Sequence, residues 1–438
     1  MVAMAKRRLS RDRRRLTATV TDLEVRRQRA LLVSLARGRL SMDAAEASLD
    51  ELERLTDTAG SDEAGRAIQQ RERPDPATYL GKGKVKELAS WGKHLDIDLV
   101  VVDGQLSPVQ QRNLQEEFKC DVVDRVALIL DIFAQHATSR EGMAQVELAL
   151  LRYRLPRLRG RGTEMSRLAG GIGTRGPGET QLESDRRRVL RRISILEKEI
   201  AGLGTARETR RKARRRSGLP SVALVGYTNA GKSSLLNALT GAGVLVDDRL
   251  FSTLDATVRR LEMPSGRIAL LSDTVGFVRD LPHELIEAFR STLEEAVETD
   301  LLLHVIDAAA PDPDGRIRAV WETLSDIGGA ELPEVLVINK VDVAPQPAVE
   351  RLCNLHPDAV VVSAVAGTGR EDLIAAMDEA LTPPTVHLSL LIPYDRGDVV
   401  AAAHEVGEVL AEGHDDRGTC LEVSLPAGEA HRFGTYAV

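Results

Sequence analysis

The sequence predicts a multidomain α/β protein, and three observations lead to this fold class. A chain of 438 residues is long enough for two to four domains. Short apolar runs alternate with amphipathic helical patterns in two separate regions, as they do in parallel α/β domains. Between these regions lies a long helical pattern with apolar residues at heptad spacing. Hydrophobic residues make up 43% and charged residues 29%, which is typical of a globular protein.

Composition excludes several classes of protein. No stretch approaches the roughly 18 apolar residues that a membrane-spanning helix needs. The basic start of the chain is not followed by the apolar run of a secretory signal. Cys120, Cys353 and Cys420 are odd in number and far apart, which supports neither a disulfide framework nor a cysteine-based zinc site. We therefore expect a protein of the reducing cytoplasm with no membrane insertion.

The charge is unevenly distributed along the chain, whose net charge is −7. Residues 1–30 hold ten Lys and Arg against three Asp and Glu, and residues 151–219 hold twenty against seven. Two basic segments on an acidic body indicate a polyanionic partner that meets only those segments. The alternative is a set of solvated arginine-rich helix faces. Aromatic residues make up only 3%, so contacts to nucleic acid should run through phosphates and shape rather than base stacking.

The first 143 residues predict an extension followed by a small domain. Residues 1–30 are expected to form a loosely ordered basic extension. Residues 31–143 alternate helix and strand and predict a parallel α/β domain. Its expected helices are 40–60, 79–95 and 107–118, and its expected strands are 96–104 and 120–125. The Gly81-Lys82-Gly83-Lys84 sequence at the start of the second helix is a weak phosphate-binding signal.

Residues 144–218 predict a helical hairpin. The first helix, from residue 144, is expected to end near Pro156. A glycine-rich segment follows, and a second helix is expected from about residues 180–183 to about 215. Its apolar residues recur every seven positions, with two isoleucines between them: Leu182, Val189, Leu196 and Leu203, with Ile193 and Ile200. This seam predicts an antiparallel coiled coil with the glycine-rich segment at its tip, a single solvated helix being the alternative.

Residues 219–383 read as β-α-β-β-α-β-α-β-α and predict a Ras-like P-loop domain. The expected strands are 221–226, 267–273, 300–307, 334–340 and 359–364. Pro383 and Pro384 mark a boundary. Residues 384–438 predict a small α+β domain with strand 386–393, helix 396–413 and strand 419–426. It is too short to bury much core alone, so we expect it to dock on a neighbour.

The strongest chemical signal is the octapeptide 226–233, which matches G-x-x-x-x-G-K-[ST] between a strand and a helix. Its residues are Gly226, Tyr227, Thr228, Asn229, Ala230, Gly231, Lys232 and Ser233. The glycines let main-chain N–H groups turn toward phosphates, Lys232 reaches the β and γ oxygens, and Ser233 offers its hydroxyl to Mg²⁺. The motif predicts a phosphate-binding loop.

Three further motifs at the ends of expected strands select the nucleotide. They are Asp273-Thr274-Val275-Gly276, Asn339-Lys340-Val341-Asp342 and Ser363-Ala364-Val365. Asp273 can bind Mg²⁺ through water, and the Gly276 N–H can meet the γ-phosphate. The Asp342 carboxylate can accept from the N1–H and the exocyclic amine of guanine, a donor pair that adenine lacks. The motifs in this order predict a domain that binds GTP.

Residues 251–255 and position 277 indicate how GTP would be hydrolysed. The segment Phe251-Ser252-Thr253-Leu254-Asp255 lies between the phosphate loop and Asp273. Thr253, chosen by spacing over Thr257, is predicted to bind Mg²⁺ and the γ-phosphate and to release them after hydrolysis, an ordinary loop threonine being the alternative. Ras-like enzymes have a water-orienting Gln at the position of Phe277. Because Phe277 cannot hydrogen-bond to water, intrinsic hydrolysis should be slow.

The water-orienting group therefore stays unassigned, with Lys232 and Thr253 as the predicted transition-state and switch contacts. A partner, a backbone group or a cation is expected to complete the site. Asn229 resembles the asparagine of GTPases that use K⁺ in place of an arginine finger, although asparagine also suits the turn.

The glycine-rich segment is the second unusual feature. It follows a helix rather than a strand, which disfavours a second phosphate loop. Small residues with two arginines at a helical tip could enter a narrow cavity lined by RNA and contact its phosphates. A flexible linker is the alternative. The predicted RNA contacts are Arg167, Gly170, Gly171, Gly173, Arg175, Gly176 and Gly178.

Over about residues 78–380 the chain resembles the HflX-type GTPases, a family of bacterial ribosome-associated GTPases. The resemblance is carried by YLGKGKVKEL (79–88), LSPVQQRNLQ (106–115), DRVALILDIFAQHA (124–137), EGMAQVELALLRYRLPRL (141–158), GGIGTRGPGETQLE (170–183), GYTNAGKSSLLNALT (226–240), FSTLDAT (251–257) and DTVGFVRDLPHELIEAF (273–289). The GTRGPGE stretch beside the phosphate loop is specific to this family. His136 stands where the family usually has Arg, and Ala256 where Pro is common.

The resemblance implies binding to the large ribosomal subunit through the glycine-rich tip and splitting of stalled or idle ribosomes in the GTP state, with hydrolysis allowing release. A GTP-gated RNA-binding or ribosome-assembly factor is the alternative. A P-loop metabolic kinase is disfavoured by Asp342. Some members use ATP through the N-terminal domain, which nothing in this sequence independently requires. Oligomeric state is open, although the seam can be satisfied within one hairpin, as expected for a monomer.

Overall fold

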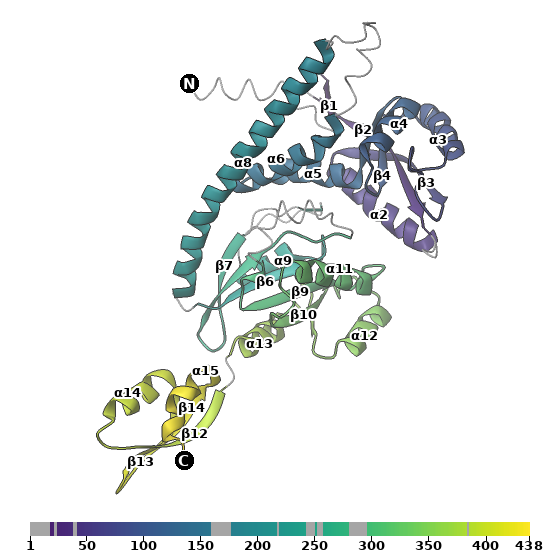
Figure 1. Cartoon of the computed structure of the whole chain (residues 1–438). Helices are drawn as coiled ribbons and strands as arrows, with labels where there is room; N and C mark the ends of the chain where they lie inside the picture. The colour runs from purple at the N-terminus through teal and green to yellow at the C-terminus, as the bar shows by residue number, and fades with distance from the viewer. Residues whose placement is uncertain are drawn as a thin grey trace. The chain divides into compact units, whose positions relative to one another are not determined.

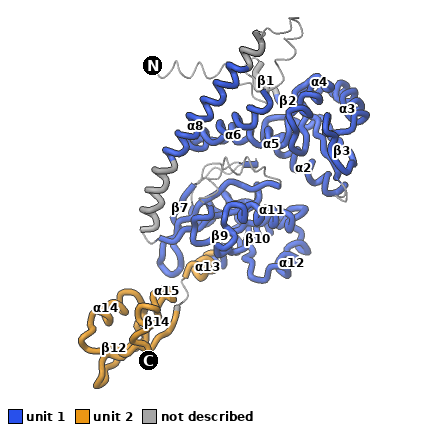
Figure 2. Tube along the Cα trace, in the orientation of Figure 1, with its two compact units in different colours: residues 1–373 blue, residues 374–438 orange. Residues whose placement is uncertain are grey.

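The computed structural model divides the chain into two compact units, residues 1–373 and residues 374–438 (Figure 2). The structure describes residues 18–21, 24–37, 42–158, 177–216, 219–241, 250–251, 257–279, 296–382 and 385–438. Within these ranges no helix is both long enough and apolar enough to cross a membrane.

The N-terminal sheet is built around strand β2 (Glu24–Ala36) (Figure 1). β2 pairs in parallel with both β3 (Ser61–Gln70) and β4 (Leu99–Asp103), and β4 pairs in parallel with β5 (Asp121–Asp124). The short β1 (Ala18–Thr21) runs antiparallel to β2. The sheet is therefore parallel apart from β1, as the alternating pattern predicts.

Successive residues of β2 and β4 enter two different cores, because neighbouring side chains of a strand point to opposite faces. On one face Leu31 packs with α3 (Lys82–Leu95) and α4 (Pro108–Phe118). On the other face Leu32 packs with α2 (Met42–Thr58) and α5 (Arg125–His136). Every residue of α5 from Arg125 to Phe133 is buried. A helix buried over this length must be covered by other elements besides its own sheet.

Two parts of this domain differ from the sequence-based expectation. β1 and the first residues of β2 fall within residues 1–30, which were expected to be loosely ordered. The apolar pattern of a strand is hard to recognise there, because Arg27 and Arg29 alternate with the buried residues in the first part of β2. β3 was not predicted, because its sequence SDEAGRAIQQ has few apolar residues and its strand depends on pairing with β2.

The predicted helical hairpin is confirmed, with α6 (Arg140–Arg154) packed on α8 (Pro177–Arg216). Ile193 and Leu196 of the seam are buried against α6, and Val189 and Ile200 pack beside them. Ion pairs join Arg140 to Glu199 and Glu147 to Arg192. Arg140, near the start of α6, pairs with the later residue of α8, and Glu147 pairs with the earlier one. The two helices are therefore antiparallel.

The long helix begins earlier than expected, at Pro177. Gly178, predicted as a loop residue, therefore lies in its first turn, where a proline with a preset φ favours helix initiation. The other predicted RNA contacts, at residues 167–176, lie outside the described residues.

The end of α6 is fixed to the N-terminal domain by Arg157, in a short 3₁₀ helix (Pro156–Leu158). Its guanidinium donates to the carbonyl of Leu106 at 2.7 Å, to Gln111 Oε1 at 2.9 Å and to Asp124 Oδ2 at 3.3 Å. Asp124 is fully buried and also caps α5 through the N–H of Ala127. The residues just before the glycine-rich segment are thus held to the N-terminal domain by several hydrogen bonds.

The third region is a six-stranded sheet in the order β11-β10-β9-β6-β8-β7. Its strands are β6 (Ser221–Gly226), β7 (Thr257–Glu262), β8 (Ile268–Asp273), β9 (Leu301–Asp307), β10 (Glu334–Asn339) and β11 (Val360–Val361). All pairings are parallel except that of β7 with β8. The described helices are α9 (Lys232–Thr240), α11 (Pro313–Asp326), α12 (Gln346–Leu355) and α13 (Arg370–Ala380). This is the predicted P-loop architecture.

The second unit contains a three-stranded antiparallel sheet in the order β12-β14-β13. Its elements are β12 (Thr385–Ile392), α14 (Gly397–Val406), β13 (Glu408–Asp415), β14 (Gly418–Pro426), α15 (Ala427–Ala430) and a 3₁₀ turn (His431–Tyr436). The helix expected at 396–413 stops at Val406, and its second half is strand β13. Gly407 ends the helix because its backbone is extended. Residues 408–415 then form a strand because they pair with β14. Leu390, Val423 and Phe433 form a small core of its own.

Candidate nucleotide-binding site

The phosphate loop, residues 226–233, leaves strand β6 and enters helix α9. Gly226 and Gly231 have φ of 151° and 95°, and Asn229 has φ of 57°. A Cβ atom on Gly226 would lie 2.4 Å from the carbonyl oxygen of Val305, and one on Gly231 would lie 2.3 Å from Asn339 Nδ2. Both glycines are therefore required by backbone conformation and by close neighbours, as the motif predicts.

Lys232 is buried at the base of this loop. Its Nζ donates to the carbonyl oxygens of Tyr227 at 3.0 Å and Gly226 at 3.2 Å. Burial lowers the pKa of Lys232 to about 8, although Asp273 acts in the opposite direction. A buried ammonium that is hydrogen-bonded to neutral carbonyls favours an anion nearby. The loop thus suits the phosphate groups of a nucleotide.

This pKa predicts that nucleotide binding takes up a proton at alkaline pH. Phosphate oxygens beside Lys232 should return its pKa toward the ordinary value, so above pH 8 the bound state holds a proton that the free protein lacks. Affinity for GDP should fall as pH rises from about 8 to about 10. Calorimetry in two buffers of different ionisation enthalpy should report an uptake close to one proton at about pH 9. Absence of uptake there would contradict a depressed pKa.

The same shift has an effect on the free protein. Because the folded pKa lies below the unfolded value of 10.5, the unfolded chain binds more protons between pH 8 and pH 10.5. The contribution of Lys232 to the free energy of unfolding therefore rises with pH in that window.

Ser233 and Asp273 form an oxygen pair beside the loop. Ser233 Oγ lies 2.5 Å from Asp273 Oδ2, and Asp273 is fully buried at the end of β8. A hydroxyl and a carboxylate are the hard oxygen ligands that Mg²⁺ prefers, with water and substrate phosphates filling the remaining positions. These residues therefore fit a magnesium ion, which Ser233 and Asp273 would hold.

The predicted base-binding residues converge from two loops. Asn339 donates through Nδ2 to the carbonyl of Ala230 at 2.9 Å and accepts the Ala364 N–H through Oδ1 at 3.1 Å. Ser363 Oγ donates to Asp342 Oδ1 at 2.7 Å, which orients that carboxylate. Asn339 thus joins the phosphate loop to the 363–365 loop, so both parts of the site have a fixed spacing.

The remaining residues of these two motifs are Lys340, Val341 and Val365. Lys340 has φ of 64° and pairs with Asp307 through Nζ at 3.1 Å. Val341 is partly buried against Ile338, whereas Val365 is 85% exposed. The side chain of Val365 is therefore exposed to solvent, so at this position only the main chain remains a candidate for contact with the base.

Replacing Asp342 by asparagine tests the guanine selectivity. The amide nitrogen of the new side chain would face the N1–H and amine donors of guanine, whereas xanthine has a carbonyl in place of that amine. We expect GDP affinity to fall by about a hundredfold and xanthosine diphosphate to bind better than it does to the wild type. Competition against a fluorescent guanine nucleotide measures both values. An unchanged GDP affinity would remove Asp342 from the site.

The segment after Asp273, residues 273–279, lies directly against the phosphate loop. The Phe277 N–H donates to the carbonyl of Gly226 at 3.1 Å, and its carbonyl accepts the Thr228 N–H at 2.7 Å. A Cβ atom on Gly276 would lie 2.8 Å from Thr228 Cα. Thr274 is buried and donates to the carbonyl of Leu224 at 2.7 Å. Only glycine at position 276 permits this approach.

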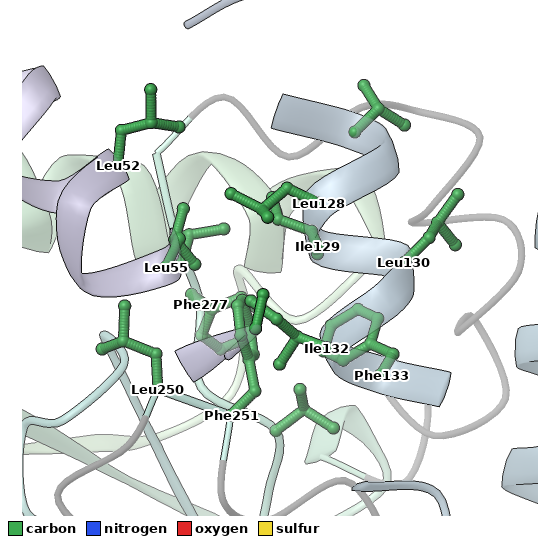
Figure 3. Close-up of a cluster of buried hydrophobic side chains, with 14 of the residues drawn as sticks. Leu52, Leu55, Leu128, Ile129, Leu130, Ile132, Phe133, Leu250, Phe251 and Phe277 are labelled. Carbon is green, nitrogen blue, oxygen red and sulfur yellow. The ribbon is translucent and has the colours of Figure 1, made fainter. Parts of the chain in front are cut away.

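Two predicted site segments are covered by the N-terminal domain, which the sequence analysis did not anticipate. Figure 3 shows Leu250, Phe251 and Phe277 among side chains of α2 and α5. The rings of Phe251 and Phe133 meet edge to face, with centroids 4.6 Å apart. Phe277 is 1% exposed, so its side chain is part of this apolar cluster. The largely apolar sequence of α5, VALILDIF at residues 126–133, was the signal that could have indicated this second cover.

Part of the predicted site lies outside the described residues, namely Ser252, Thr253, Leu254 and Asp255. Thr257, the alternative to Thr253, is the first residue of β7 and pairs with Asp273 in the sheet. Val275 is buried beside Phe277 in the apolar cluster.

Comparisons with known proteins found both matching family models and similar chains. Three family models match in succession: a GTP-binding GTPase N-terminal region at residues 46–134, a GTP-binding GTPase middle region at 136–214 and a 50S ribosome-binding GTPase at 221–340. GTPase HflX of Caldanaerobacter subterraneus is 44% identical, covering 94% of both chains. GTPase HflX of Escherichia coli K12 is 40% identical, covering 88% of this chain and 91% of its own. A solved GTP-binding protein of Sulfolobus solfataricus in complex with GDP is 26% identical, covering 80% of this chain and 98% of that chain, with a TM-score of 0.42.

Proposed function

Because the chain belongs to the HflX family of GTPases, which bind and hydrolyse GTP, we propose that it uses this activity on the ribosome. The proposed partner is the large ribosomal subunit with its RNA. The proposed outcome is dissociation of stalled or idle ribosomes under stress, with ribosome-stimulated hydrolysis allowing release. The protein acts in the cytoplasm as a monomer that is partly ribosome-bound.

The observation that carries this proposal is a basic arm in the same compact unit as the nucleotide site. The hairpin α6–α8 is held to the N-terminal domain by Arg157, and residues 151–219 hold twenty basic against seven acidic residues. Guanidinium groups and glycine N–H groups are suited to RNA phosphates. The acidic remainder of the chain disfavours non-specific RNA binding. Such a protein should contact RNA through its basic segments, the arm among them, rather than through its acidic remainder.

The nucleotide site supplies the groups that phosphoryl transfer needs, apart from one. Lys232 and the main-chain N–H groups of residues 229–233 would bind the β and γ phosphates. Ser233 and Asp273 would hold Mg²⁺, which neutralises phosphate charge when bound. Phe277 cannot orient the attacking water. We propose that the ribosome or a K⁺ ion near Asn229 completes the site.

Sucrose gradients test the ribosome proposal. Purified 70S ribosomes are incubated with the protein and GTP, a non-hydrolysable GTP analogue or GDP. We expect monosomes to fall into subunits with GTP and with the analogue, and to stay intact with GDP. Binding to large subunits without loss of monosomes would favour the second candidate, a GTP-gated assembly factor.

Multiple-turnover hydrolysis tests how the site is completed. Rates are measured with and without purified large subunits, in K⁺ and in Na⁺. Stimulation by subunits in both salts would assign completion to the ribosome, and stimulation by K⁺ alone would assign it to the cation.

A further inference from the structure

The turn that carries the base-binding residues contains a strained main-chain position. Lys340 lies between Asn339 and Asp342 and has φ of 64°, in the left-handed region. A residue with a Cβ atom adopts this region at a cost, because the Cβ atom crowds the following carbonyl oxygen. Such a conformation persists at a functional site when the surrounding contacts hold it. The contacts that hold Lys340 therefore bear on the position of Asp342, two residues later.

Main-chain hydrogen bonds fix the chain on both sides of this turn. Asp307, the last residue of β9, lies opposite Asn339, the last residue of β10, in the parallel pair. The Ala308 N–H donates to the carbonyl of Asn339 at 3.0 Å. The carbonyl of Lys340 accepts the Ala344 N–H at 3.0 Å. These bonds fix the main chain before and after the turn, and none of them uses a side chain.

The Lys340 side chain is held by the neighbouring strand. Its Nζ lies 3.1 Å from Asp307 Oδ2, and the two side chains are 27% and 11% exposed. The other oxygen of this carboxylate accepts the Ala309 N–H at 3.0 Å, which orients it toward the lysine. Arg316 lies farther away, 3.8 Å from Asp307 Oδ2. A partly buried ion pair is screened less by solvent than an exposed one, so Asp307 fixes the end of the Lys340 side chain.

The same side chain runs past the phosphate loop. The Cε atom of Lys340 lies 4.0 Å from the position that a Cβ atom on Gly231 would take. Burial lowers the pKa of Lys232, Asp273 raises it, and the charge of Lys340 lowers it further. Lys340 is therefore close enough for its charge to act at the loop, and the Asp307 carboxylate offsets that charge.

We propose that Asp307 is a positioning residue for guanine recognition: by pairing with Lys340 it holds the 339–342 turn in the conformation that directs the Asp342 carboxylate at the base. Ser363 Oγ holds the same carboxylate from the other loop, at 2.7 Å. Asp307 acts through Lys340 rather than on the nucleotide. This role concerns the bound nucleotide alone, so it can be tested apart from any action on the ribosome.

The variant Asp307→Asn tests the proposal, because it keeps the size of the side chain and removes its charge. GDP affinity should fall by about tenfold, the effect of losing one partly buried charged hydrogen bond. Charge alone predicts the opposite sign, since an unbalanced Lys340 beside the loop would attract phosphate groups more strongly. Competition against a fluorescent guanine nucleotide measures the change. An unchanged or higher GDP affinity would overturn the proposal.

Inosine diphosphate provides a readout that a general loss of structure would not move. Its base has the N1–H of guanine but lacks the exocyclic amine, so it can donate only one hydrogen bond to Asp342. A displaced Asp342 carboxylate should gain less from the second donor. The preference for GDP over inosine diphosphate should therefore fall by about threefold in Asp307→Asn. An equal loss of affinity for both nucleotides would show that Asp342 is not displaced, against the proposal.

Asp314→Asn is the matched control. Asp314 also forms an ion pair within this domain, joining the first turn of α11 to Arg351 of α12. This variant should keep both the GDP affinity and the preference over inosine diphosphate within about twofold of the wild type. Thermal unfolding without nucleotide should show that both variants are folded. Equal loss of GDP affinity in the two variants would assign the effect to a general weakening of the domain and overturn the proposal.

Lys340→Met provides the reciprocal test, because it removes the ammonium that Asp307 holds. In this background Asp307→Asn should change GDP affinity by less than about twofold, since the partner of the carboxylate is already absent. The double variant should thus bind GDP about as well as Lys340→Met alone. A tenfold effect of Asp307→Asn in both backgrounds would show that Asp307 acts independently of Lys340, which would also overturn the proposal.

Discussion

Replacing Lys232 by alanine is expected to abolish nucleotide binding and, with it, every ribosome-dependent activity. The ammonium is buried and sits on the phosphate loop, 3.0 Å from the carbonyl of Tyr227. Truncating a buried charged partner of a phosphate costs about 4 kcal/mol, or about a thousandfold in affinity. Equilibrium binding of fluorescent GDP and GTP measures this loss, and gradients of ribosomes with GTP measure its consequence.

The free Lys232→Ala protein should nevertheless fold. Because burial depresses the pKa of Lys232, the charged side chain is unfavourable to the nucleotide-free fold near neutral pH. Thermal unfolding without nucleotide should therefore stay within a few degrees of the wild type, while the stabilisation by added GDP should vanish. Lys84→Ala is a suitable control, because Lys84 also follows a glycine but pairs with Glu87 on α3. Ribosome splitting by Lys232→Ala would contradict the proposed mechanism.

Shortening the glycine-rich segment at residues 170–178 should leave intrinsic hydrolysis near normal and remove its stimulation by ribosomes. The phosphate loop and the base-binding loops are distant in sequence from this segment and contain none of its residues. If the segment contacts RNA phosphates, its removal should also flatten the salt dependence of ribosome binding. GTP hydrolysis with and without large subunits, at two salt concentrations, measures both effects.

A second variant distinguishes a segment that contacts RNA from one that only connects the two helices. Replacing residues 167–176 by glycine and serine keeps the length of the connection and removes Arg167 and Arg175. Loss of stimulation in this variant would assign the effect to the side chains. Full stimulation in both variants would mean that the segment is a linker and that ribosome recognition lies elsewhere on the chain.

The conformation of the 226–233 loop could be predicted because its local backbone geometry demands glycine at particular positions. A Cβ atom would collide with Val305 at position 226 and with Asn339 at position 231. Only glycine fits at these two positions, so the glycine motif in the sequence indicates the loop conformation directly. The hairpin was predictable for a similar reason, since heptad spacing at Val189 and Leu196 places both on one helix face.

Features that depend on distant partners could not be predicted. Strand β3 has few apolar residues and exists through pairing with β2, and strand β13 continues a helix-like sequence past Gly407. The hydrogen bond between Glu51 and Tyr227 joins residues 176 positions apart. No motif spans that distance. The burial of Phe277 likewise depends on α5 of another domain.

The shared apolar cluster sets a condition for work on isolated parts of this protein. Leu250, Phe251 and Phe277 are covered by α2 and α5, which lie before the hairpin in the chain (Figure 3). A fragment starting near residue 219 would leave two phenyl rings facing water and would lose the acceptor for the Tyr227 hydroxyl. Its turnover would then describe a rearranged pocket, so rates from such truncations should not be assigned to the intact enzyme.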